Sequence, residues 1–350
     1  MASPRLILPE GRLSPLARLN RYLKSSAFAQ SRFFIFVDEH TYSHCLSQTV
    51  AQVESLQDAE FIEFPVGEEF KSAEVAIQVW QSLMESGADR QSVVVNLGGG
   101  CVSDVGAFVA STYMRGLRYV NIPTTLIGMV DAAIGGKTAL NLAGVKNVVG
   151  TFHMPSAVCV EPSFLTSLPE ADVRAGCVEL LKTLVVGGAI DEMPSTGWKR
   201  LLTVDNISTA LRIKASVVSR DPFDRDVRHI LNFGHTFGHA IESYSLAQQR
   251  PLAHGFAVGV GMLCALYLSV RKLGLSQRHY DCFHSWISEL MPLPHFSLRD
   301  AESILQLMHH DKKNADGNLL CVLLQDMGAP AVDVPVDDME VRDALLAAVK

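Results

Sequence analysis

The sequence lacks the features of a disulfide-rich or membrane-spanning protein. Its seven cysteines are an odd number, lie scattered along the chain and include no Cys-x-x-Cys pair. This pattern argues against a disulfide framework and a thiolate zinc site, and it predicts reduced, buried thiols in a cytoplasmic protein. The chain has no apolar signal segment near Met1 and no uninterrupted apolar run of about 18 residues. We therefore expect no membrane span.

Positive charge is scarce as well. The chain carries 30 Lys and Arg against 37 Asp and Glu, and no basic run is longer than a pair such as Lys312 and Lys313. General binding to nucleic acid is therefore not expected. If the substrate is an anion, the fold must gather the cations that hold it. A chain of 350 residues with 48% apolar and 19% charged content suits a compact protein of one to three domains.

Residues 1–160 alternate between short apolar runs and amphipathic segments. Buried strands are expected at residues 33–37, 60–64, 93–97 and 119–122, with helices at about 39–56 and 73–86. Strands that alternate with helices form a parallel sheet with helices on its faces. Residues 1–160 are therefore predicted to form an α/β, Rossmann-like domain.

Residues 161–350 have a helical pattern instead. They are predicted to form an all-α domain, interrupted only by a late strand at 319–324. The helices are expected at about 169–187, 205–219, 228–245, 254–273, 276–290, 298–312 and 339–349.

A glycine turn, Gly98–Gly100, connects a predicted strand to a predicted helix. Such a turn lets main-chain amides and the helix N-terminus approach an anion, but it can equally be a tight connection that binds nothing. It is not a Gly-x-Gly-x-x-Gly fingerprint. Asp38 at the end of one strand and Thr124–Thr125 after another favour a nucleotide, because nucleotides bind at the carboxyl ends of parallel strands.

Several charged residues stand in apolar, glycine-bearing sequence. Asp131, Lys137, Lys146 and Asn147 share one such segment, in which a free ammonium group would be poorly placed. The helical half adds Lys182, Lys214 and Arg228. Most lysines are solvated surface residues, but an anionic substrate would explain these.

Three histidines form the most distinctive pattern. His235 and His239 are four residues apart, so they share one helix face, and His254 begins the next predicted helix. Each histidine alone is best interpreted as a core residue. Grouped histidines suit zinc or a similar divalent ion. With Glu179 as the third ligand, two of them would form a His₂Glu set that leaves open coordination positions. The spacing leaves open whether both His235 and His239 bind the metal.

Two glycines, Gly234 and Gly238, flank this histidine pair. Each glycine inside a helix costs roughly 1 kcal/mol relative to alanine. We therefore expect another part of the molecule to approach this helix closely.

The motifs together resemble the 3-dehydroquinate synthase family. The resemblance covers most of the chain and is densest at residues 98–182 and 214–262. It rests on the motifs Gly-Gly-Gly-x-x-x-Asp, Arg-Gly, Pro-Thr-Thr-Leu, Val-Asp-Ala-x-x-Gly-Gly-Lys-Thr, Lys-Asn-x-x-Gly-x-Phe, Glu-x-x-Lys, Leu-Asn-x-Gly-His-x-x-Gly-His-Ala-x-Glu and His-Gly. The family usually continues the last motif with Glu, where this chain has Phe256.

The resemblance implies the 3-dehydroquinate synthase-like fold, with NAD⁺ as cofactor and a divalent metal, Zn²⁺ or Co²⁺. The metal ligands at matching positions are Glu179, His235 and His254. The positions that match the cofactor site are Asp38, Glu68, Lys71, Gly99, Gly100, Cys101, Val102, Asp104, Thr124, Thr125, Lys137, Lys146, Phe164, Thr166 and Ser167.

The implied substrate is a phosphorylated sugar acid, 3-deoxy-D-arabino-heptulosonate 7-phosphate, which the family converts to 3-dehydroquinate and phosphate in the shikimate pathway. Lys137, Lys214 and Arg228 match residues that hold the carboxylate. A second set lies near the phosphate: Asn147, Lys182, Asn232, His239 and either Lys312 or Lys313. Asp131 matches a further catalytic residue. Arg115 matches one supplied across a dimer interface, so a homodimer is implied.

Three other interpretations compete with this one. Sister sugar phosphate cyclases share the fold, but they alter the loop occupied here by Gly135-Gly136-Lys137-Thr138. Metal-dependent enzymes similar to glycerol dehydrogenase share the two-domain layout without needing the lysine cluster. A binding protein without activity would not need every proposed ligand and cation.

Overall fold

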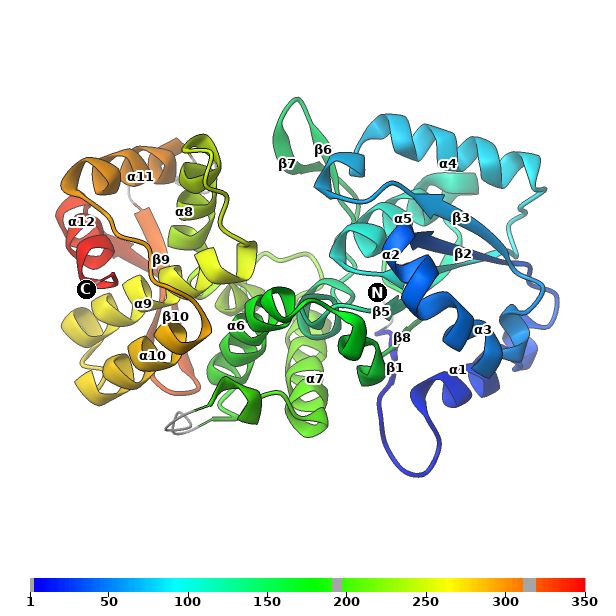
Figure 1. Ribbon diagram of the computed structural model, residues 1–350, viewed down its shortest axis with the longest axis horizontal. Coiled ribbons are helices and arrows are strands. Elements are labelled where there is room, and N and C mark those ends of the chain that lie inside the picture. The colour runs from blue at the N-terminus through cyan, green and yellow to red at the C-terminus, as the bar shows by residue number, and fades with distance from the viewer. Residues whose placement is uncertain (1–2, 191–196, 311–318, 350) are drawn as a thin grey trace. The chain divides into compact units, whose positions relative to one another are not determined.

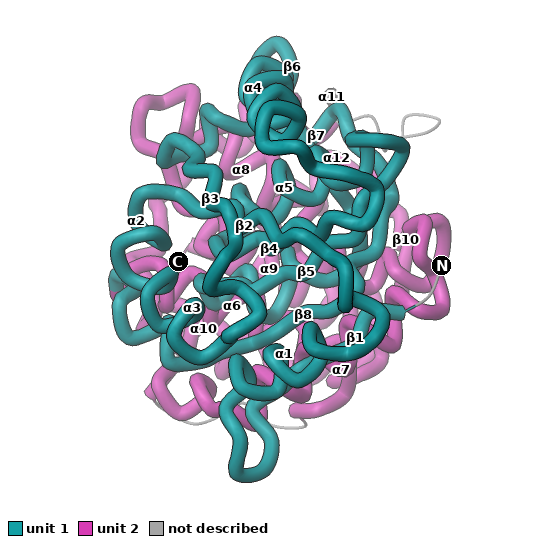
Figure 2. Tube along the Cα trace, turned by 90° about the vertical axis from the view of Figure 1, so that its right-hand side faces the viewer, with its two compact units in different colours: residues 1–169 teal, residues 170–350 magenta. Residues whose placement is uncertain are grey.

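The computed structural model describes residues 3–190, 197–310 and 319–349. The chain forms two compact units, Met1–Pro169 and Glu170–Lys350 (Figures 1 and 2). The first unit contains a parallel sheet with helices, and the second is mostly helical, as the sequence predicts.

The first unit is built on a six-stranded sheet in the order β1-β8-β5-β4-β2-β3, in which every neighbouring pair is parallel. The strands are β1 (Arg5–Ile7), β2 (Phe33–Asp38), β3 (Glu60–Phe64), β4 (Val93–Gly98), β5 (Arg118–Pro123) and β8 (Ala157–Cys159). The helices of this unit are α1 (Pro15–Leu23), α2 (Glu39–Thr41), α3 (Ser47–Gln52), α4 (Ala73–Glu85) and α5 (Gly100–Thr112). Phe34 and Phe36 of β2 lie in a buried cluster with Val79 of α4 and Phe108 of α5.

The order of the strands reverses at β2. Strand β3 lies on one side of β2 and strand β4 on the other, so the carboxyl ends of β2 and β4 form a switch point of the kind at which α/β proteins bind ligands. Asp38 ends β2 and Gly98 ends β4. Thr124, just after β5, donates its main-chain N–H to Gly98 O at 3.1 Å. The sheet therefore brings three predicted cofactor-binding segments to one edge.

A two-stranded antiparallel hairpin stands where the sequence suggested only a glycine-bearing loop. It consists of β6 (Leu140–Leu142) and β7 (Val145–Val149). Its two turn residues, Ala143 and Gly144, have φ values of 51° and 79°. Two positive φ values are typical of a type I′ turn, but the usual signal for that turn is Asn-Gly or Asp-Gly. The Ala-Gly pair is not such a signal, so the sequence did not predict this hairpin.

The second unit has seven longer helices among its described residues. They are α6 (Glu170–Val186), α7 (Val204–Arg220), α8 (His235–Ala247), α9 (His254–Leu273), α10 (Gln277–Leu290), α11 (Leu298–His310) and α12 (Asp338–Ala347). Helix α9 packs against α6, α8, α10 and α12, so it is the core of this unit. It is also long and apolar enough to cross a membrane by length and composition alone, but 67% of that stretch is buried inside the protein, which is typical of a core helix.

The second unit is not entirely helical. The expected late strand is β9 (Leu319–Asp326), and it pairs with β10 (Ala329–Val336), which the sequence analysis missed. Strand β10 contains Pro330 and Pro335, residues that are tolerated only on edge strands or at bulges. β10 is such an edge, with two irregularities in its register. The end of the helix expected at 298–312 lies outside the described residues.

The helix expected at 228–245 is broken. A short 3₁₀ segment, Val227–Asn232, precedes α8, and Gly234 between them has a φ of +79°. Helix α9 is the close neighbour of Gly234 and Gly238. A Cβ on Gly238 would lie 3.0 Å from the Cα of Val258, and one on Gly261 would lie 2.1 Å from Gly234 O. The glycines are therefore explained by tight packing of α8 on α9.

Gly261→Ala is expected to lower the free energy of unfolding by about 3 kcal/mol, because the methyl group meets rigid main-chain atoms of α8. Denaturant unfolding measures the loss. Gly259→Ala is the matched control on the same helix, since its methyl group would meet only side-chain atoms at 3.3–3.5 Å, and it should change stability by less than about 1 kcal/mol. Equal effects of the two substitutions would contradict this account of the α8–α9 contact.

Candidate functional site

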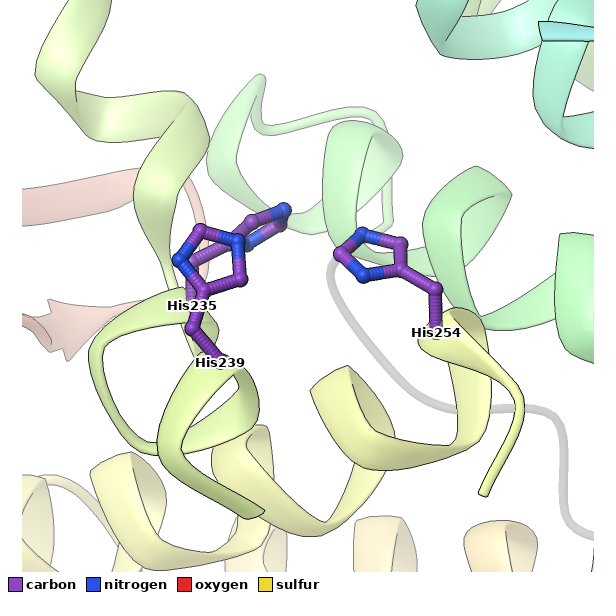
Figure 3. Close-up of side chains that lie close together, drawn as sticks. All are labelled: His235, His239 and His254. Atoms are coloured by element: carbon purple, nitrogen blue, oxygen red, sulfur yellow. The ribbon is translucent and has the colours of Figure 1, made fainter. Parts of the chain in front are cut away.

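Four candidate metal ligands converge in the second unit. Helix α6 supplies Glu179, α8 supplies His235 and His239, and α9 supplies His254 at its first residue. One ring nitrogen of each histidine lies within 4.8 Å of the others (Figure 3). The Nε2 atoms of His235 and His254 lie 3.6 and 3.7 Å from Glu179 Oε1. Two ligands bound tetrahedrally to one zinc ion are about 3.3 Å apart, so these separations are close to those of a shared ion.

Glu179 shows that a cation fits here. Its side chain is completely buried, and its Oε1 atom has no hydrogen-bond partner among the described residues. Lys182 Nζ, itself buried, lies 2.6 Å from the other oxygen, Oε2. An unpaired carboxylate oxygen in a protein interior is costly, and Oε1 faces two imidazole nitrogens. A divalent ion bound by Glu179, His235 and His254 would satisfy it.

The protein fixes the tautomers of two histidines. His235 Nδ1 donates to the main-chain oxygen of Phe233 at 3.3 Å, and His254 Nδ1 donates to Glu242 Oε2 at 2.9 Å. Each ring therefore presents its Nε2 lone pair toward Glu179. Burial lowers the pKa of His254, but its hydrogen bond to Glu242 and the charges of Glu179 and Glu242 outweigh that effect, so the pKa is raised.

His239 is a fourth candidate. Its ring centre lies 5.3 Å from that of His235 and 5.8 Å from that of His254. The geometry therefore permits a three-histidine set as well as the His₂Glu set. Assignment of the metal to Glu179, His235 and His254, with His239 near the substrate, remains a prediction.

The second unit also buries three of the predicted substrate cations. Lys182, Lys214 and Arg228 are at most 5% exposed. Helix α7, which carries Lys214, packs against α6 and against the segment Val227–Asn232, which carries Arg228 and the half-buried Asn232. Arg228 is anchored because its main-chain N–H donates to Asp221 Oδ2 at 3.2 Å. The second unit therefore gathers three buried cations, one of which, Lys182, pairs with Glu179.

In the first unit, Lys71 is the centre of a polar cluster. Its buried Nζ lies 2.9 Å from Asp104 Oδ2, 2.6 Å from Asn147 Oδ1 and 3.4 Å from Glu68 Oε1. Burial lowers the pKa of Lys71, but the charges of Asp104 and Glu68 outweigh this effect. The pKa is therefore raised, and the amine is held charged. The cluster joins three predicted cofactor residues to Asn147, which was predicted to contact substrate.

Asn141 completes this cluster, and the sequence analysis did not select it. Its side chain donates to Glu68 Oε1 at 3.2 Å and accepts the main-chain N–H of Asn147 at 2.9 Å. Asn147 has a φ of +53°, and the Asn141 bond supports that conformation. Cys101 also belongs here, since its thiol donates to Glu68 Oε2 at 3.0 Å.

Close packing explains two of the glycines in the turn Gly98–Gly100. A Cβ on Gly98 would lie 2.5 Å from Val102, and one on Gly99 would lie 3.0 Å from Thr125. Gly100 is the first residue of α5, where a Cβ would meet only ordinary contacts. The turn is therefore tight, and it also leaves the start of α5 at the switch-point edge of the sheet.

Other predicted cofactor residues have local structural partners. Asp38 caps α2, because its Oδ1 accepts the N–H of Thr41 at 2.8 Å. A 3₁₀ segment, Pro162–Ser167, carries Phe164, which is buried, and Thr166 and Ser167, whose hydroxyls bond to its main chain. Their contacts with NAD⁺ remain predictions.

The environment of two lysines differs from the expectation. Lys137 and Lys146 are exposed, not enclosed in apolar surroundings. Lys146 lies on the hairpin strand β7, whereas Lys137 precedes the hairpin and forms an isolated bridge with Phe152. Asp131 is half-buried in a short helical turn, Gly128–Ala132. Arg115 is exposed and has a φ of +68°. Lys312 and Lys313 lie outside the described residues.

Solved structures with the same fold include two cyclases. One is 2-deoxy-scyllo-inosose synthase complexed with carbaglucose-6-phosphate, NAD⁺ and Co²⁺, with a TM-score of 0.81 and 25% identity over 95% of this chain and 94% of that one. The other is 2-epi-5-epi-valiolone synthase from Streptomyces hygroscopicus subsp. jinggangensis with NAD⁺ and Zn²⁺ bound, with a TM-score of 0.80 and 25% identity over 99% and 97%. The fold is that of the sugar phosphate cyclases.

Sequence comparisons identify one family within the sugar phosphate cyclases. Residues 61–175 match the 3-dehydroquinate synthase N-terminal family model, and residues 183–314 match the C-terminal one. A 3-dehydroquinate synthase of Parabacteroides distasonis is 34% identical over 329 residues, which cover 91% of this chain and 92% of that protein. The chain belongs to the 3-dehydroquinate synthase family. The resemblance drawn from its motifs is confirmed.

Proposed function

We propose that this chain converts 3-deoxy-D-arabino-heptulosonate 7-phosphate to 3-dehydroquinate and phosphate, as an NAD⁺- and divalent-metal-dependent lyase. The buried, unsatisfied oxygen of Glu179 facing His235 and His254 is the observation that carries the proposal, because it fits a metal ion. Membership of the family supplies the reaction.

The second unit would hold the metal and most of the substrate. Glu179, His235 and His254 would bind Zn²⁺ or Co²⁺, which as a Lewis acid lowers the pKa of substrate hydroxyls. Lys214 and Arg228 would pair with the substrate carboxylate, while Lys182, Asn232 and His239 would contact its phosphate. Charge-assisted hydrogen bonds of this kind are worth about 1.5–3 kcal/mol each. The buried positions of Lys182, Lys214 and Arg228 strengthen them, because water does not compete.

The first unit would hold the cofactor. When bound, NAD⁺ would supply reversible hydride transfer, so that phosphate could leave without net oxidation of the substrate. Residues at the switch-point edge would bind it: Asp38, Glu68, Lys71, Gly99, Gly100, Asp104, Thr124 and Thr125. Lys146 and Asn147 of β7, and Lys137 just before the hairpin, would contact ligand, which suits their exposed positions. We further propose a cytoplasmic homodimer in which Arg115 of a second copy contributes to the site.

Incubation with the heptulosonate phosphate and catalytic NAD⁺ tests the function. Phosphate and 3-dehydroquinate should form in equal amounts, and NADH absorbance should show no net growth, because each hydride taken from substrate is returned. NADH that accumulates in proportion to substrate consumed would contradict the proposal and indicate a simple dehydrogenase. Binding of the substrate without phosphate release would indicate a protein that has lost its activity.

A further inference from the structure

We propose that Glu242 is a positioning residue for the metal site: its carboxylate orients His254 and thereby sets the affinity for the metal. This inference rests on the proposed function only in that the metal is held by Glu179, His235 and His254. Glu242 is the last residue of the motif Leu-Asn-x-Gly-His-x-x-Gly-His-Ala-x-Glu, and the sequence analysis assigned it no role.

The geometry links two helices. Glu242 lies seven residues after His235 on α8, whereas His254 is the first residue of α9. The Nδ1 atom of His254 lies 2.9 Å from Glu242 Oε2, and its other nitrogen, Nε2, lies 3.7 Å from Glu179 Oε1. The carboxylate therefore holds the proton on Nδ1 and directs the lone pair of Nε2 toward the other two ligands.

His254 needs this support more than the other ligands do. Its side chain is 36% exposed, compared with 12% for His235 and none for Glu179. Packing alone therefore restrains its ring least. His235 is oriented by the carbonyl of Phe233, a neutral main-chain acceptor, while His254 has a charged acceptor. Hydrogen bonds to ionised acceptors are about twice as strong as neutral ones, and they make the imidazole a better electron donor.

Residue 256, two positions after His254, is a phenylalanine and not an acid. Phe256 cannot accept a hydrogen bond from His254. Glu242, on the neighbouring helix, provides the carboxylate acceptor that the structure shows.

A purely structural role for Glu242 is the competing explanation. Its carboxylate lies beside the N-terminus of α9, where negative charge stabilises a helix by about 0.3–1 kcal/mol. Such a role would lower the melting temperature of the metal-free protein without changing metal affinity. Metal affinity is therefore the readout that separates the two explanations.

The test measures the Kd for Zn²⁺ by chelator competition, and the visible absorption of bound Co²⁺, in the full-length protein. Glu242→Ala should weaken Zn²⁺ binding by about 10- to 100-fold and alter the Co²⁺ spectrum. Glu242→Gln keeps the shape and an acceptor oxygen, so it should fold normally and fall between wild type and Ala. Asp343→Asn, which removes an exposed charge from α12, is the matched control and should leave the Kd within about twofold.

Unchanged Kd values in both Glu242 variants, with wild type binding Zn²⁺ tightly, would overturn the inference and leave the proposed function intact. Failure of wild type itself to bind Zn²⁺ or Co²⁺ would overturn the metal site on which both depend. The two failures are thus distinguishable without any measurement of turnover.

Discussion

Replacing His235 by alanine is expected to abolish tight metal binding and to lower kcat/KM by at least about 1000-fold. The substitution removes a proposed metal ligand, whose Nε2 atom lies 3.6 Å from Glu179 Oε1. Loss of the Lewis acid forfeits several kcal/mol of charge stabilisation, and each 1.4 kcal/mol is a factor of ten in rate. Elemental analysis of the purified variant, together with an assay of phosphate release, measures both effects.

His239→Ala is the matched comparison, because His239 lies on the same helix, one turn further along. If the metal belongs to Glu179, His235 and His254, the His239 variant should keep a full metal complement and lose only turnover. A His235 variant with full metal content would contradict the assigned ligand set. Loss of metal from the His239 variant would instead support a site that includes all three histidines.

Replacing Lys71 by methionine is expected to weaken NAD⁺ binding by roughly 10- to 100-fold and to lower the free energy of unfolding by about 2–3 kcal/mol. Methionine fills similar space but leaves Asp104, 2.9 Å away in the wild type, without its cation. The stability loss should be smaller than that for a fully buried pair, because the Asp104 side chain is 21% exposed. Denaturant unfolding and NAD⁺ titration measure the two effects separately.

The double variant Lys71→Met/Asp104→Asn separates the charge from the packing. Removing both charges leaves no unpaired carboxylate, so part of the lost stability should return. NAD⁺ binding should stay weak, because both residues belong to the predicted cofactor site. An additive loss of stability in the double variant would show that the Lys71–Asp104 pair is not coupled.

Much of the fold could be predicted, because its signals are local. Apolar runs such as Val93–Leu97 are long enough to indicate buried strands, and their alternation with helices determines a parallel sheet. The hairpin β6–β7 and strand β10 escaped prediction because their signals are unusual: an Ala-Gly turn in one and two prolines in the other. The break before α8 depends on contact with α9, which no local pattern shows.

The candidate site could be predicted where the spacing of residues along the sequence indicates their chemistry. His235, His239 and His254 could be selected together, but their spacing could not decide which of them bind metal, and the geometry still permits more than one set. Asn141 could not be selected, because its role depends on contacts with residues 73 positions before it and 6 after it. The exposure of Lys146 depends on a hairpin that the sequence did not reveal.

Product identification in a reaction with the heptulosonate phosphate and catalytic NAD⁺ tests the central claim most directly. The account predicts 3-dehydroquinate and inorganic phosphate in equal amounts, formed only by metal-loaded protein, with no net NADH. A different cyclised product, or a product retaining its phosphate, would contradict it.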